Sequence, residues 1–387
     1  MKFGLFGSAQ AKRGGPDVDS AKGYRDWLEY NTEAEALGFH STFAVEHHFT
    51  GFGQVSATVN LLTYLAAQTS TIRLGTAVMV LPWHNPVLLA EQVATLDLLS
   101  GGRFDFGVGK GYRFNEFQGF RIPMEEAQAR FEESLKIMTK SWTEDEPWTY
   151  EGEFWSFEDV VVEPPTAQQP HPPFWMGAGS PASIETVAER GYNLLVDQFA
   201  PVDTTIGRVD TFRDSVEARG RTFNPYDVGV ARGLYVAKDA ADRDAAIERR
   251  IAARSRVDNL AQRPDGGNKA SIMSYDDSVE ATAAAAMFGT VDEIVEKIQT
   301  FHDAGVRYML FSDGGTGIEG LRTFSKEIMP HFADDEDDEA SSRKKAIMFA
   351  ALGMAVVLLS ALGGAGWWIL SAPSETASAG KNAPGTV

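Results

Sequence analysis

Residues 1–333 alternate two hydrophobic patterns. Short apolar runs of strand length are followed by segments in which apolar residues recur every three or four positions, and this second pattern is typical of amphipathic helices. The alternation predicts strand–helix units that build a parallel sheet covered by helices. The predicted strands are 2–6, 41–45, 72–81, 104–108, 174–176, 193–196, 228–236 and 306–311.

The number of units favours a closed barrel. Roughly eight strand–helix units in about 330 residues suit an α/β fold of the (β/α)8 TIM-barrel type with insertions. A doubly wound sheet is the alternative, but its G-x-G-x-x-G fingerprint does not follow the first predicted strand. In a barrel, the active-site residues are expected at the C-terminal ends of the strands.

Two stretches interrupt this pattern. Residues 144–173 and 254–288 have weak periodicity, and both contain turn-forming residues. Loops of this length in a compact domain are usually functional or disordered. We therefore predict long loops in both places, and we interpret 255–287 as a lid that shields the barrel mouth from water.

The C-terminal pattern differs from the rest of the chain. Residues 346–372 form a stretch without a charged residue that is long enough to cross a bilayer. Three basic residues, Arg343, Lys344 and Lys345, precede it. Trp367 and Trp368 lie near the far end, where interfacial aromatic residues belong. The alternative is a buried core helix, although such helices rarely lack a polar face.

The sequence therefore predicts four regions. Residues 1–333 form the barrel, 334–345 an acidic and then basic linker, 346–372 a transmembrane helix and 373–387 a short tail. We therefore expect a single-pass protein of the cell membrane, held in the lipid bilayer by 346–372. By the positive-inside rule, the barrel lies in the cytoplasm.

The composition excludes several classes of chemistry. The chain has no cysteine, so disulfides, thiolate metal sites, iron–sulfur clusters and a cysteine nucleophile are excluded. Its 387 residues carry a formal net charge of −19, which is unfavourable for binding nucleic acid, because phosphates attract a positive surface. We expect neither a nucleic-acid partner nor a metal site.

Candidate chemistry lies at the ends of three predicted strands. His47 and His48 follow the second strand, and adjacent side chains of an extended segment point to opposite sides. One imidazole is thus expected to face the barrel mouth as an acid or base, unless both only form hydrogen bonds within the loop. Two glycines, Gly107 and Gly109, end the fourth strand and precede Lys110, so backbone and cation could both approach a ligand.

The fifth predicted strand leads into a helix start. Gly179 is followed by Ser180 and Pro181, with Ser183 three residues after Ser180. Ser180 suits an N-cap, and free N–H groups at a helix start favour phosphate. An ordinary helix cap is the simpler reading of this segment alone, but Lys110 at a neighbouring strand end favours a phosphate ligand.

Taken together, these segments resemble the bacterial luciferase-like flavin monooxygenases. The resemblance covers about residues 1–333 and rests on motifs in the right order and spacing. The matching segments are Glu46-His47-His48-Phe49-Thr50, Leu74-Gly75-Thr76-Ala77, Val80-Leu81-Pro82, Ala90-Glu91-Gln92, Ser100-Gly101-Gly102-Arg103-Phe104-Asp105-Phe106-Gly107, Phe288-Gly289-Thr290 and Ile328-Met329-Pro330.

The resemblance implies roles for individual residues. His47 is implied to lie at the flavin ring as a catalytic residue, with His48 supporting it. A cis peptide beneath the ring is implied between Ala77 and Val78. The residues implied to bind the cofactor are Ala77, Val78, Gly109, Lys110, Gly179, Ser180 and Ser183.

The resemblance also implies a reaction. Reduced FMN, supplied by a separate flavin reductase or reduced in place by NAD(P)H, reacts with dioxygen to a peroxyflavin that oxidises an apolar organic substrate. Luciferases proper have Cys-Arg where this chain has Gly109-Lys110 and Glu where it has Gly179, which argues against light emission. The alternatives are a deazaflavin-dependent hydride-transfer enzyme and a membrane-tethered, non-catalytic flavin-binding protein. We also expect a homodimer.

Overall fold

A closed ring of eight parallel strands forms the centre of the protein in the computed structural model, which describes residues 1–261, 275–276 and 278–333. Each strand pairs with the next, and the last pairs with the first. In ring order the strands are β1 (Lys2–Gly7), β2 (Ser41–Ala44), β3 (Arg73–Thr76), β5 (Phe104–Gly109), β8 (Phe174–Gly177), β9 (Asn193–Val196), β10 (Val228–Val236) and β12 (Tyr308–Asp313). The predicted TIM-type barrel is confirmed.

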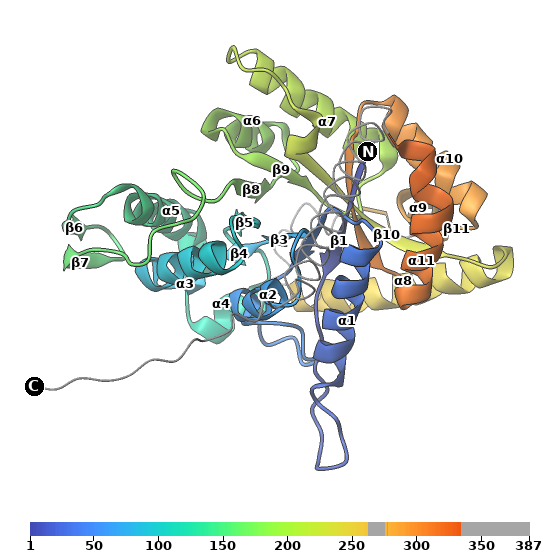
Figure 1. The fold of residues 1–387 in the computed structure, drawn as a ribbon, viewed down its shortest axis with the longest axis horizontal. Coiled ribbons are helices and arrows are strands. Elements are labelled where there is room, and N and C mark those ends of the chain that lie inside the picture. The colour runs from blue at the N-terminus through green and yellow to red at the C-terminus, as the bar shows by residue number, and fades with distance from the viewer. Residues whose placement is uncertain (262–274, 277, 334–387) are drawn as a thin grey trace, which may run out of the picture. The chain divides into compact units, whose positions relative to one another are not determined.

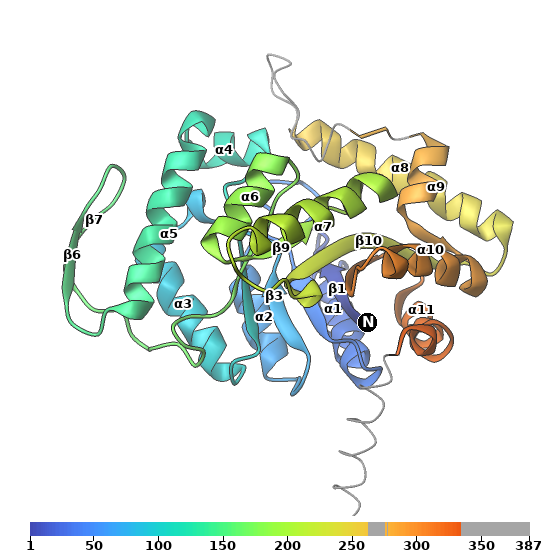
Figure 2. The ribbon, with the colours of Figure 1, turned by 90° about the horizontal axis from the view of Figure 1, so that it is seen from above.

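Helices surround this ring (Figures 1 and 2). Some of them begin at caps that the sequence supplies, such as Asn85 before α3 and the reciprocal Thr290–Glu293 box before α10. The helices are α1 (Lys22–Ala36), α2 (Thr58–Ala66), α3 (Pro86–Leu99), α4 (Phe114–Phe120), α5 (Ala127–Thr143), α6 (Pro181–Arg190), α7 (Val202–Glu217), α8 (Ala240–Ala261), α9 (Val279–Ala285), α10 (Val291–Asp303) and α11 (Gly317–Thr323).

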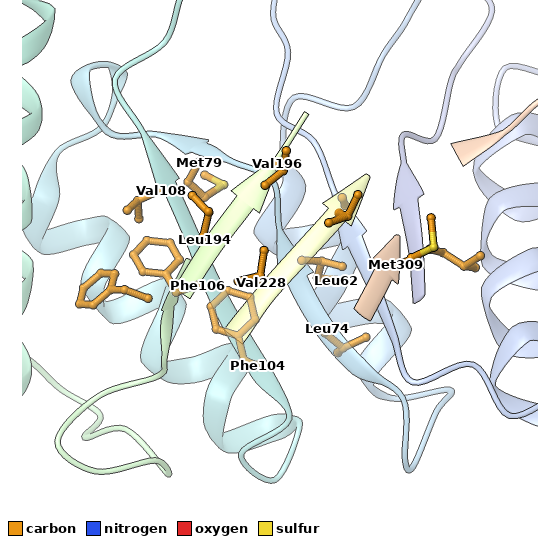
Figure 3. Close-up of a cluster of buried hydrophobic side chains, with 14 of the residues drawn as sticks. Leu62, Leu74, Met79, Phe104, Phe106, Val108, Leu194, Val196, Val228 and Met309 are labelled. Carbon is orange, nitrogen blue, oxygen red and sulfur yellow. The ribbon is translucent and has the colours of Figure 1, made fainter. Parts of the chain in front are cut away.

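The main hydrophobic core lies between the strands and these helices. Along β5, Phe104, Phe106 and Val108 are all fully buried in it, and Leu62 of α2 belongs to the same cluster (Figure 3). These β5 residues are two positions apart, so they share one face of the strand. The alternation of strand residues therefore places one set of apolar side chains under the helices.

The opposite set of strand residues fills the inside of the barrel. In β12, Tyr308 and Leu310 belong to the inner cluster, whereas the next residue along, Met309, belongs to the outer core. Phe43 and Trp175 complete the inner packing, with their rings edge to face at 5.4 Å. A Cβ atom on Gly75 would lie 2.3 Å from the Phe43 ring, so this glycine makes the room that the ring needs.

The predicted third strand, 72–81, is wrong as a single element. It divides into β3 and β4 (Met79–Val80), and a short 3-10 helix, Leu81–Trp83, follows. The Ala77–Val78 peptide between the two strands is cis. The pattern could not show the division, because apolar residues continue through it. The last predicted strand begins two residues later than expected, at Tyr308, after a Gly305 with a positive φ.

Both predicted long loops contain regular structure. Within 144–173, β6 (Trp148–Glu151) and β7 (Ser156–Val160) pair as an antiparallel hairpin, which projects beside α5 (Figures 1 and 2). Within 254–288, α8 continues to Ala261, α9 follows, and β11 (Met287–Gly289) pairs with β10. The weak periodicity hid the end of α8, because the sequence of this helix is rich in Ala and Arg, which favour helix without an apolar stripe. The prediction of a loop is therefore wrong for these helical parts, and the role of 255–287 as a lid stays a prediction.

The predicted transmembrane helix, 346–372, lies outside the described residues, as do the predicted linker, 334–345, and the tail, 373–387. Among the residues that the structure describes, no helix is long and apolar enough to cross a membrane. Met1–Phe332 forms one compact unit.

His40 gives the barrel a testable dependence on pH. Burial, together with the charges of Lys2 and Arg73, lowers the pKa of His40 to about 4. The unfolded chain binds this proton near pH 6.5, so stability is lost as the pH falls from about 6.5 to about 4. Replacing His40 by Gln should remove roughly 2 kcal/mol of that loss. Urea unfolding at pH 7.5 and pH 5 measures it; equal pH dependence in both proteins would contradict the prediction.

Candidate active site

The loops at the C-terminal ends of the strands enclose a cavity of about 1150 Å³. Its floor is apolar, because Leu195, Ala231 and Leu310 of the inner cluster face it from below. Among the predicted site residues, His47, Ala77, Val78, Gly109, Lys110 and Gly179 line the cavity, whereas His48, Ser180 and Ser183 do not. The rule for barrels thus found the place of the site from the sequence.

His47 is held by a buried carboxylate. Its Nδ1 lies 3.0 Å from Oε1 of Glu116, a residue of α4 that is only 1% exposed. A carboxylate only accepts hydrogen bonds, so Nδ1 carries the proton and Nε2 is the free acceptor of the ring. Burial lowers the pKa of His47, although Glu116 opposes the shift. His47 is therefore neutral near pH 7 and suited to accept a proton.

His48 does not reach the cavity, but it belongs to a network behind it. Its Nε2 lies 3.0 Å from Oε1 of Glu46, and Nε2 of His84 lies 2.7 Å from the same oxygen. The backbone N–H of Val80 donates to the second oxygen of Glu46 at 2.7 Å. Burial raises the pKa of Glu46, but the hydrogen bonds from His48 and His84 outweigh it and leave the pKa below its ordinary value. The ionised Glu46 thus ties the His48 loop to β4.

The predicted cis peptide between Ala77 and Val78 is confirmed, and that it lies beneath a flavin stays a prediction. The glycines of β5 make room for this segment. A Cβ atom on Gly107 would lie 1.7 Å from the carbonyl oxygen of Thr76, and one on Gly109 would lie 2.6 Å from Val78. Gly107 therefore makes room for the neighbouring strand β3, and Gly109 makes room for Val78. Gly109 also lines the cavity, and the approach of its backbone to a ligand stays a prediction.

Lys110 and Gly179 lie at the ends of paired strands, β5 and β8. The Lys110 Nζ donates to Gln128 at 3.0 Å, and within the described residues no carboxylate forms an ion pair with it. Two of its three N–H groups therefore stay available for an anion. The carbonyl of Gly179 accepts a hydrogen bond from Arg208 at 2.9 Å, and Arg208 is itself paired with Asp197 at 2.7 Å.

Ser180 and Ser183 form a reciprocal capping box at the start of α6. The Ser180 hydroxyl accepts from the Ser183 N–H, and the Ser183 hydroxyl accepts from the Ser180 N–H. The predicted N-cap is thus confirmed, and both hydroxyls already have partners in it. Binding of phosphate by these two residues stays a prediction.

Sequence reasoning missed the residues that organise the site. Glu46 appears in the sequence analysis only as part of a motif. No role was predicted for Glu116, Arg113 or Arg208. The sequence contained one signal for two of these residues. Arg113 and Glu116 follow Lys110, at the end of the fourth predicted strand, within six positions. Only the fold shows that α4 returns to the His47 loop and buries Glu116 there.

The barrel and this cavity define the chain as a TIM-barrel protein with a candidate active site at the C-terminal ends of its strands. Residues 1–308 match the model of the luciferase-like monooxygenase family. The chain therefore belongs to this family of oxidoreductases.

Several known proteins are similar over most of the chain. The oxygenase component of the flavin-dependent trigonelline monooxygenase from Acinetobacter baylyi is 24% identical, over 87% of this chain and 97% of its own. The monooxygenase RslO1 from Streptomyces bottropensis is 28% identical, with a TM-score of 0.72 over 86% of this chain and 100% of its own. An F420-dependent secondary alcohol dehydrogenase, with a TM-score of 0.68 at 20% identity over 86% and 99%, shares the fold.

The cavity residues fit a flavin. The floor and the Ala77–Val78 segment offer an apolar face to a flat ring, and the volume exceeds what a mononucleotide fills. Lys110 and the start of α6 would hold its phosphate. When bound, the flavin supplies the redox chemistry that none of the twenty side chains provides.

The contact between His47 and Glu116 has a measurable consequence. The Glu116 carboxylate raises the pKa of His47 against the effect of burial, so replacing Glu116 by Gln should lower this pKa further. The pH titration of the His47 ring proton by NMR measures the change, with the resonance assigned from a His47→Gln variant. The matched control is Glu189→Gln, which alters an exposed residue of α6. An unchanged His47 titration in Glu116→Gln would contradict the contact.

Proposed function

We propose that this chain is the oxygenase component of an FMN-dependent monooxygenase. Reduced FMN would come from a separate flavin reductase, and dioxygen and an apolar organic substrate would be consumed. The observation that carries the proposal is that His47, the cis Ala77–Val78 segment and Lys110 line one cavity with an apolar floor. The oxygenase component from Acinetobacter baylyi, similar over almost its whole length, supports it.

Different side chains would bind the cofactor, exclude water and accept a proton. Lys110 would pair with the flavin phosphate, and the apolar floor would exclude water from the ring and the substrate. His47, neutral and fixed by Glu116, holds an acceptor at Nε2 that can take a proton from the substrate or return it. Glu46 keeps β4, which follows the cis peptide, attached to the histidine loop.

Oxygen uptake tests the function against its alternatives. The full chain, mixed with FMN, NADH and a general flavin reductase, should bind FMN and turn over an apolar substrate in an oxygen-dependent way. His47→Ala should keep FMN binding and lower turnover by about 10²–10⁴-fold. Tight binding of the deazaflavin F420 with no oxygen uptake would favour the hydride-transfer alternative. FMN binding without turnover of any compound would favour a non-catalytic flavin-binding protein.

Lys110 gives a sharper prediction about the cofactor. A charge-assisted hydrogen bond is worth about 1.5–3 kcal/mol, so Lys110→Ala should weaken FMN binding at least tenfold. Riboflavin lacks the phosphate and should bind the variant nearly as well as the wild type. Fluorescence titration with both ligands measures this, with Lys326→Ala, an exposed lysine that does not line the cavity, as the control. Equal weakening of both ligands would remove Lys110 from the phosphate site.

We also propose that residues 346–372 anchor the protein in the cell membrane, with the barrel on the cytoplasmic side. The support is the uncharged stretch itself, with Arg343–Lys345 before it and two tryptophans near its end. An anchor would hold the cavity near the bilayer, where apolar substrates concentrate. The predicted homodimer stays a prediction.

Truncation tests the anchor. A chain ending at Ala333 keeps the whole compact unit, Met1–Phe332, and should bind FMN without sedimenting with membranes. The full chain should stay in the membrane pellet through washes with high salt and with carbonate, because these release proteins held only by charge. Release of the full chain by either wash would refute the anchor.

A further inference from the structure

Arg113 is a buried cation on the wall of the cavity. It lies between β5 and α4, its residue is only 3% exposed, and it lines the cavity together with His47. Burial removes a guanidinium from water at a cost of several kcal/mol, unless an anion and hydrogen bonds replace the water. The groups that replace the lost water around the Arg113 guanidinium therefore indicate the role of this residue.

The protein supplies little of that replacement. Within the described residues, no carboxylate forms an ion pair with Arg113, and its buried Nε has no hydrogen-bond partner. The two buried carboxylates of this part of the cavity, Glu46 and Glu116, are bound to histidines. The hydrogen-bond partners of the Arg113 side chain are neutral: Nη1 donates to Oε1 of Gln54 at 3.3 Å, and the guanidinium also donates to the side chain of Tyr112.

That hydrogen bond also fixes the direction of the Gln54 amide. A guanidinium only donates hydrogen bonds, so the amide must turn its oxygen toward Arg113. The NH2 group of Gln54 then faces away from Arg113 as a second donor, and Gln54 lines the same cavity. The unpartnered Nε–H of Arg113 and the NH2 group of Gln54 are each suited to an anionic oxygen.

Arg113 has other partners than Lys110, which contacts Gln128. Its contacts are with Gln54 of the β2–α2 loop and with the Tyr112 ring at 5.8 Å. Its charge also acts on His47, whose pKa it helps to lower after burial. The cation therefore lies near the proposed proton acceptor, where a substrate would be.

We propose that Arg113, assisted by Gln54, binds a carboxylate of the substrate. The substrate would then be amphipathic, with an apolar body on the cavity floor and a carboxylate on the planar, two-donor edge of the guanidinium. This inference rests on the proposed function, since it names the substrate class for the same cavity, and it adds an anionic group to the apolar substrate expected from the sequence.

Two probes that differ in charge test the proposal on the full chain. Phenylacetate and phenylacetamide have nearly the same size, and binding of each to the flavin-free protein is measured by intrinsic tryptophan fluorescence, to which Trp27 on the cavity wall contributes. The wild type should bind phenylacetate at least tenfold more tightly. Arg113→Met, which keeps the length of the side chain, should bind both probes equally, with phenylacetamide unchanged. Arg113→Lys should keep part of the preference, and Gln54→Leu should reduce it several-fold.

Lys110→Met is the matched control, because it removes a cation from another wall of the same cavity. It should weaken FMN binding and keep the preference for phenylacetate. The proposal is overturned if the wild type shows no preference, if Arg113→Met retains it, or if Arg113→Met only weakens FMN binding. Unchanged phenylacetamide binding and an unchanged melting temperature show that the variant is folded. Failure of the wild type to bind FMN would contradict the proposed function instead, and the flavin-free titrations would still decide the role of Arg113.

Discussion

The packing inside the barrel is the constraint on which the rest of the structure depends. Phe43, Trp175 and Tyr308 fill the interior with large rings, and Phe43 fits only because Gly75, its partner on the neighbouring strand β3, has no side chain. A ring of parallel strands closes only when its interior is filled, since an empty interior would cost the contacts of every lining side chain. The rings stop below the strand ends, and smaller residues such as Ala231 take over there. The cavity is thus the part of the barrel interior that the large residues leave open.

Above this packing, two buried carboxylates organise the site. Glu46 and Glu116 are each 1% exposed, and a carboxylate at such a depth is tolerable only with several hydrogen bonds. Glu46 receives them from His48, His84 and Val80, and Glu116 from His47 and the backbone of His48. Each carboxylate therefore binds segments that are distant in the sequence. The pairs restrict the histidine loop to one arrangement, and the same contacts set the tautomer of His47.

The sequence predicted the parts that follow from local rules. The alternation of strand-length and helix-period segments predicted the barrel, and the Ser180 cap predicted the start of α6. The resemblance located the cis peptide at Ala77–Val78. It failed where a residue's role is decided by distant neighbours. Glu116 and Arg113 look like ordinary charged residues in the sequence, and only the return of α4 to the β2 loop buries them. The same holds for Gly107, because the backbone of Thr76 on the neighbouring strand occupies the space where a side chain would lie.

The charges of the cavity also resolve an apparent conflict with the composition. A chain of net charge −19 repels anions at long range, yet Lys110 and Arg113 both line the cavity, and the described residues offer neither of them a carboxylate partner. Salt screens the charges of the surface within about 10 Å, whereas charges in a partly dehydrated cavity are screened much less. Acidic residues line the cavity as well, among them Asp26, Asp197 and Asp313, so the two cations can attract an anionic group only at short range. Glu46 and Glu116 contact histidines rather than Lys110 or Arg113, and both cations therefore keep hydrogen-bond donors for such a group.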